Sequence, residues 1–207
     1  MPVPIHRVSR GRDETATVSR TANRRRQRGQ TLVEFALVVP LFMGILIAIV
    51  EFAFTFNAVL AAQYSSRDAA LVAAEAGNAD GADCAILRTV EDDMGAPANP
   101  NDLVSVEVYQ SSASGDQIGA ATVYARGGAF DCTMPDGNSI TLPYTRTQDG
   151  YPEAGRCNVL AGCAGRELDH VGVKVTYRYE WKTPIGHGIS PYLDVTRSNS
   201  MRMEPVL

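Results

Sequence analysis

Residues 31–56 read TLVEFALVVPLFMGILIAIVEFAFTF, a long and almost uninterrupted apolar stretch. Glu34 and Glu51 are its only charged residues. A helix of this length spans about 39 Å, at about 1.5 Å per residue, and the hydrocarbon core of a bilayer is about 30 Å thick. The stretch therefore predicts one transmembrane helix, which we place at residues 30–56.

Charge is distributed unevenly on the two sides of this helix. Residues 1–29 carry eight arginines against two acids, a net charge of +6, whereas residues 30–207 carry a net charge of −10. Lysine and arginine are enriched on the cytoplasmic side of membrane helices. We therefore expect a single-pass protein of the cell membrane, with a basic cytoplasmic leader at residues 1–29 and an extracytoplasmic domain at residues 57–207. The arginines are explained by topology, and we expect no nucleic-acid partner.

Two other readings of the apolar stretch fit the sequence less well. A core helix of a soluble protein rarely follows such a basic cluster. A cleaved secretory signal peptide has an apolar region of about 7–15 residues followed by small residues at the cleavage site. Here the apolar run is longer, and Glu51 interrupts it before any such site.

The start of the helix carries an unusual acid. Gly29 follows the arginine cluster of residues 24–28, and Glu34 stands five residues after this glycine. A carboxylate near hydrocarbon costs a few kcal/mol, so such a residue is a candidate functional site. The alternative is that Glu34 lies at the membrane surface and is solvated there by lipid headgroups.

Three segments carry a family resemblance. Residues 29–40 (GQTLVEFALVVP), residues 49–53 (IVEFA) and, more weakly, residues 197–205 (RSNSMRMEP) resemble TadE/TadG-like pseudopilins, accessory proteins of the Flp, or tight-adherence, pilus system. The resemblance implies cleavage between Gly29 and Gln30 by a prepilin-type peptidase on the cytoplasmic side, although Gln30 replaces the hydrophobic residue common there in pilins. Glu34 would then be the fifth residue of the mature chain.

The same resemblance implies how the chain assembles. Glu34 of one subunit would pair with the freed amino group of Gln30 in its neighbour, which offsets the cost of burying the carboxylate. Glu51 is a second residue that we expect to act in assembly. The expected partners are the membrane, other pilin or pseudopilin subunits and the prepilin-type peptidase.

The remaining sequence predicts an α+β domain. Residues 57–76 continue the long helix as far as a stop at Gly77, and residues 83–94 form a second helix. Strands are expected at residues 103–110, 117–125, 170–182 and 193–203, whereas residues 127–166 are expected to be a long loop region. The clearest strand is the third of these segments, residues 170–182, in which Val171, Val173 and Val175 share one face. A long helix that leaves the membrane and packs on an antiparallel sheet is a pilin-like arrangement.

Four cysteines follow the transmembrane helix: Cys84, Cys132, Cys157 and Cys163. An even number in an oxidising compartment indicates disulfides, and three pairings are open. We prefer Cys157 with Cys163, which closes a short loop, and Cys84 with Cys132, which would tether the large loop to the helix. A zinc site with His170 or His187 is the alternative, but no zinc-ligand spacing supports it.

No motif in the sequence indicates catalysis. A phosphate-binding loop, Gly-x-Ser-x-Gly and His-Glu-x-x-His are all absent, and the acidic run 91–93 reads as a solvated helix face. We therefore expect neither an enzyme nor a cofactor or metal site. The expected function is that of a TadE-like pseudopilin or accessory subunit in assembly of a Tad/Flp-type pilus or secretion apparatus. The alternative is a membrane-anchored exported binding domain unrelated to pili, with its site at residues 127–166.

Overall fold

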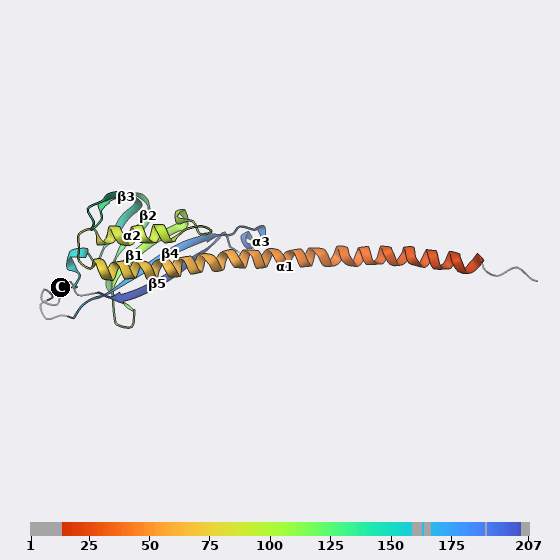
Figure 1. Ribbon diagram of the computed structural model, residues 1–207, viewed down its shortest axis with the longest axis horizontal. Coiled ribbons are helices and arrows are strands. Elements are labelled where there is room, and N and C mark those ends of the chain that lie inside the picture. Colours follow the sequence, from red (N-terminus) through yellow and green to blue (C-terminus); the bar gives the residue numbers. More distant parts are fainter. Residues whose placement is uncertain (1–13, 159–162, 164–166, 189, 204–207) are drawn as a thin grey trace, which may run out of the picture. The chain divides into compact units, whose positions relative to one another are not determined.

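The computed structural model describes residues 14–158, 163, 167–188 and 190–203 (Figure 1). The chain divides into two compact units, Met1–Ile49 and Val50–Leu207. Helix α1, Glu14–Ala76, contributes residues to both units. We call the second unit the sheet domain.

The first unit consists, in its described part, of the N-terminal portion of α1. From residue 29 onward its apolar side chains are largely exposed, and Leu37 and Leu41 are 73% and 68% exposed. The most apolar part of α1 has a mean hydropathy of 2.6 and is not buried at all. Among the described residues this is one helix long and apolar enough to cross a membrane, which confirms the predicted candidate transmembrane helix near the N-terminus.

The sheet domain contains one antiparallel sheet of five strands in the order β3-β2-β1-β4-β5. The strands are β1 Leu103–Ser111, β2 Gln117–Thr133, β3 Ser139–Asp149, β4 His170–Glu180 and β5 Tyr192–Arg202. The further helices are α2 Ala82–Asp93 and α3 Pro184–His187, with short 3-10 turns at Pro100–Asp102 and Glu153–Gly155. Helices and an antiparallel sheet together confirm the predicted α+β class.

Helices α1 and α2 lie over one face of the sheet (Figure 1). The α1 side of this layer is built largely from alanines, and Ala62, Ala69 and Ala73 are fully buried. An alanine side chain adds little bulk, so the helix backbone can lie close to the valines of β1 and β4. The alanine-rich sequence after the apolar stretch is thus the surface by which α1 packs on its own domain.

Strand β4 has the predicted two faces. Val171, Val173, Val175, Tyr177 and Tyr179 are buried, and the residues between them are half-buried or exposed except for the buried Gly172. Side chains of a strand point alternately to opposite faces, so one face joins the core while the other faces outward. The prediction for this strand is confirmed, although β4 ends at Glu180 rather than at residue 182.

The expectation of a loop region at residues 127–166 is wrong over its first half. Strand β2 continues to Thr133, and Ser139–Asp149 form the edge strand β3. Two glycines with positive φ, Gly127 and Gly128, lie where the pairing of β2 with β3 shifts register. Glycine adopts such a backbone without steric cost, so the two residues bend β2 and do not end it.

Helix α1 ends where the sequence predicts. Gly77 has φ of 56° and donates its N–H to the carbonyl of Ala73 at 3.1 Å. Glycine is the usual residue for this left-handed helix end. The chain then turns at Gly81 and enters α2, whose bounds agree with the predicted second helix within one residue.

Substituting Gly81 by alanine is expected to lower the free energy of unfolding by about 2 kcal/mol. Gly81 has φ of 84°, and an added Cβ would overlap the backbone carbonyl of Thr133. Gly137 provides the matched control, because it has φ of 90° with nothing within 4 Å of an added Cβ. Gly137→Ala should cost only about 1 kcal/mol. Urea unfolding of the full chain in detergent measures both, and equal losses would contradict the close approach at Gly81.

Candidate functional site

The predicted processing site lies in the first unit, on α1. Gly29 and Gln30 are both exposed, and nothing lies within 4 Å of a Cβ added at Gly29. The Nε2 group of Gln30 donates a hydrogen bond to Oε1 of the exposed Glu34 at 3.2 Å, one helical turn further on. Because Gly29 and Gln30 are helical here, a peptidase that binds its substrate extended would have to unwind this turn.

Glu51 has a different environment, which the sequence did not indicate. It belongs to the sheet domain and is only 6% exposed. Its Oε1 atom accepts a hydrogen bond from the hydroxyl of Tyr179 at 2.6 Å and another from the backbone N–H of Lys182 at 3.0 Å. Buried carboxylates require such donors, because burial without them is strongly unfavourable.

Tyr179 is held as a neutral donor in this contact. Burial, together with its hydrogen bond to Glu51, raises the pKa of Tyr179 from 10.0 to about 12. The ring of Trp181 packs edge-on against the ring of Tyr179, with 5.6 Å between the ring centroids. Glu51 therefore joins α1 to the end of β4 within the sheet domain, and its expected role in assembly stays a prediction.

A second polar contact joins α1 to the sheet further along the helix. The side-chain amide of Asn199, on β5, donates to Oγ of Ser66 at 2.6 Å and lies 3.4 Å from the carbonyl of Gln63. Ser66 is fully buried. Two polar contacts, one at Glu51 and one at Ser66, thus fix the register of α1 against the sheet.

The beginning of α2 contains a buried ion pair. An Nη2 atom of Arg156 contacts Oδ1 of Asp83, and the side chains are 0% and 4% exposed. The hydroxyl of Tyr124 donates to the other carboxylate oxygen of Asp83 at 2.7 Å. Burial, and then the charge of Asp83, raise the pKa of Tyr124 well above its ordinary value. Glu153 accepts from the backbone N–H groups of Gly81 and Asp83 at 3.2 and 2.5 Å and so caps the helix.

Asp169 organises the segment that leads into β4. Its carboxylate accepts hydrogen bonds from Nε2 of Gln110 at 2.9 Å, from the hydroxyl of Tyr151 at 2.9 Å and from the backbone N–H of Cys157 at 3.0 Å. Its backbone carbonyl accepts from Met203 at 2.9 Å. This buried acid therefore ties β1, the 151–158 segment and the end of β5 together, which is a structural role.

The acidic run 91–93 is only partly the solvated face that the sequence predicts. Asp92 is exposed and pairs with Arg88. Glu91 is half-buried, contacts Arg126 and accepts a hydrogen bond from the hydroxyl of Tyr144 at 2.6 Å. Burial, together with Asp68 and Asp92, raises the pKa of Asp93. Glu91 thus fastens α2 to β2 and β3, which is why it is not free in solvent.

The cysteines form two disulfides, Cys84–Cys132 and Cys157–Cys163, with Cα–Cα distances of 5.8 and 5.6 Å. This is the pairing that we preferred from the sequence. The longer link does not hold a loop, however, because Cys132 lies in β2. With all four cysteines in disulfides, no thiolate is available for the zinc alternative.

A cavity of about 280 Å³ lies beside the Cys84–Cys132 disulfide, and Tyr124, Arg146 and Glu153 line it. Two of these polar groups already have structural partners. Glu153 caps α2, and Tyr124 donates to Asp83. We assign no ligand to this cavity.

Comparison with protein families identifies the start of the chain. The family model described as TadE-like protein matches residues 29–71. This confirms the resemblance over the segment that contains Gly29, Gln30, Glu34 and Glu51, and it indicates a function related to the Tad pilus. The match does not reach residues 197–205, where the resemblance stays a prediction. No curated protein and no solved structure matches the chain.

Proposed function

We propose that the chain is a pseudopilin-like or accessory subunit in assembly of a Tad/Flp-type pilus or secretion apparatus, because its residues 29–71 match TadE-like proteins. The observation that carries the proposal is this match, which begins at Gly29 and includes Glu34. The role is structural. The partners are other pilin or pseudopilin subunits and a prepilin-type peptidase that cuts between Gly29 and Gln30.

The orientation is part of the proposal. The basic residues 1–29 lie in the cytoplasm, and the sheet domain lies outside the cytoplasmic membrane. Arginines concentrated immediately before the apolar helix support this direction. Two disulfides in the sheet domain also support it, because disulfides persist in oxidising compartments.

Glu34 is the residue that directs assembly in this proposal. It is exposed, and its carboxylate accepts a hydrogen bond from the side-chain amide of Gln30 on the same helix. In an assembly the carboxylate would pair with the amino group that cleavage creates on Gln30 of a neighbouring subunit. This pairing would offset the cost of placing an acid beside hydrocarbon.

Replacing Glu34 by alanine is expected to reduce incorporation into the sheared surface fraction of the native host about tenfold or more, since about 1.4 kcal/mol corresponds to tenfold. The variant should stay in the membrane, because the apolar helix is intact. Glu75→Ala is the matched control, since Glu75 is an exposed acid on the same helix beyond the TadE-like match. Incorporation of Glu34→Ala at the level of the control would contradict the proposal.

A further inference from the structure

The exposed apolar side chains of the sheet domain gather at one end of it. From Val50 onward, nine large hydrophobic residues are exposed among those that the structure describes. Six of them lie on α1 next to Glu51 or at the start of β5: Val50, Phe52, Phe54, Phe56, Tyr192 and Leu193. Single exposed apolar residues are ordinary on protein surfaces, but a gathered set marks an interaction site.

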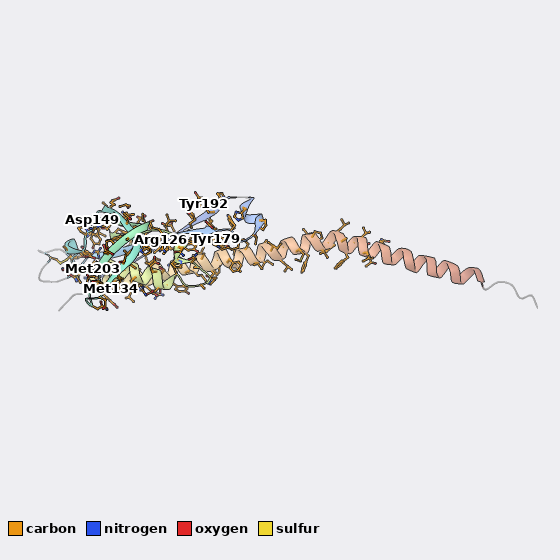
Figure 2. The ribbon with its side chains drawn as sticks, turned by 90° about the horizontal axis from the view of Figure 1, so that it is seen from above. Arg126, Met134, Asp149, Tyr179, Tyr192 and Met203 are labelled. Carbon is orange, nitrogen blue, oxygen red and sulfur yellow. A yellow bond between two sulfur atoms is a disulfide. The ribbon has the colours of Figure 1, made fainter. Side chains whose placement is uncertain are left out.

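Hydrogen bonds to Glu51 place the apolar residues of α1 and those at the start of β5 at the same position along the helix. The Tyr179 hydroxyl and the Lys182 backbone N–H both bond to its carboxylate, so the end of β4 lies beside this turn of α1. Tyr192, the first residue of β5, pairs with Glu180 in the sheet. Figure 2 shows Tyr179 and Tyr192 at one end of the domain, with Asp149 and Met203 at the other end.

The length of the apolar run places Glu51 at the edge of the bilayer. Residues 31–50 are twenty residues that end immediately before Glu51, and roughly 20 residues span a hydrocarbon core of about 30 Å. With Glu34 near the other edge, the hydrocarbon ends close to Val50. Glu51, with its partners, then stands within one helical turn of the headgroup region.

The connection between β4 and β5 also has the composition of a membrane interface. Lys182 and His187, in the connection, are exposed. Arg178, near the end of β4, pairs with Asp194 at 2.8 Å, and its guanidinium lies 4.0 Å from the ring centroid of Tyr192. Tyrosine, tryptophan and basic side chains are enriched at the headgroup level, where their apolar parts face the hydrocarbon and their polar ends stay hydrated.

This connection is folded onto the domain. A Cβ added at Gly186, in α3, would overlap the ring of Trp181, so the α3 turn packs directly on that ring. Trp181 in turn packs on Tyr179, the partner of Glu51. The surface is therefore already formed and needs little ordering when it meets a partner.

We propose that this surface rests on the headgroup region of the bilayer that α1 spans, so that the sheet domain is seated on the membrane. The surface is formed by residues 52–56 of α1, the part of the β4–β5 connection at residues 181–188 and the first residues of β5. The occupant is lipid and not a second protein, because the surface adjoins the end of the apolar span. The inference requires membrane anchoring but does not depend on the proposed role in pilus assembly.

The chain contains one tryptophan, Trp181, so its fluorescence tests the proposal directly. The full chain is placed, at high dilution, in vesicles of phosphatidylcholine and phosphatidylglycerol that carry a nitroxide quencher at the headgroup level. Two variants in a Trp181→Phe background are compared, Tyr192→Trp and Ile118→Trp. Ile118 is 49% exposed and lies at the opposite end of the sheet, about nine residues or roughly 30 Å along β4.

The proposal predicts that tryptophan at position 192 loses most of its fluorescence to the quencher, whereas tryptophan at position 118 keeps nearly all of it. In the wild-type chain, which needs no substitution, Trp181 should also be quenched more strongly than the tryptophan at position 118. Equal quenching at positions 192 and 118, or none at position 192, would overturn the proposal. Quenching at position 192 that disappears on dilution of protein in lipid would also overturn it, since a second copy would then cover the surface.

Discussion

Replacing Asp83 by alanine is expected to lower the free energy of unfolding of the sheet domain by about 3–5 kcal/mol, because it leaves a charge buried without its partner. The guanidinium of Arg156 is fully buried against Asp83, and the hydroxyl of Tyr124 loses its acceptor in the same change. Urea unfolding of the full chain in detergent, with disulfides intact and followed by Trp181 fluorescence, gives this free energy.

Asp92→Ala is the matched control for this experiment. Asp92 lies on the same helix, and its pair with Arg88 has side chains 57% and 50% exposed. Exposed pairs of this kind contribute about 0.5 kcal/mol or less. Adding Arg156→Met to Asp83→Ala should recover much of the stability, because an apolar side chain replaces the unpaired charge. A loss in Asp83→Ala no larger than in Asp92→Ala would contradict the buried ion pair.

Replacing Glu51 by alanine is expected to cost about 3–4 kcal/mol, since two buried donors, the Tyr179 hydroxyl and the Lys182 N–H, lose their acceptor. Glu51→Gln provides the control, because its amide oxygen can accept the same two hydrogen bonds, and it should cost about 1 kcal/mol. The same unfolding measurement separates the two variants. If alanine and glutamine have equal effects, Glu51 does not hold α1 to β4 in the way that the structure indicates.

The regular elements with strong periodicity could be predicted from the sequence. The apolar run of α1, the glycine stop at Gly77 and the alternating valines of β4 each follow from local chemistry. Strand β3 could not be predicted from composition, because Gly, Asp and Pro are typical of loops. Pro143 is tolerated there since β3 is the edge strand of the sheet and, among the described strands, pairs with β2 alone. The alternation of Ile140, Leu142 and Tyr144 was the signal that could have identified it.

The partners of the buried acids could not be predicted from the sequence, for a different reason. Glu51 and Tyr179 are separated by 128 residues, and Asp83 and Arg156 by 73. The sequence can indicate that an acid inside an apolar helix needs a partner, but only the folded sheet brings that partner within hydrogen-bond distance. For Glu34 and Gly29, the sequence is more informative than the structure. Their significance comes from the sequence pattern at the start of the TadE-like match, and the isolated chain gives them few contacts.

Processing at Gly29 can be tested by the N-terminal sequence and mass of the protein recovered from membranes of its own host, with and without the prepilin-type peptidase. We expect a mature chain that begins at Gln30 when the peptidase is present and an uncut chain when it is absent. An intact N-terminus in both hosts would contradict this expectation, because Glu34 would then have no freed amino group of Gln30 with which to pair.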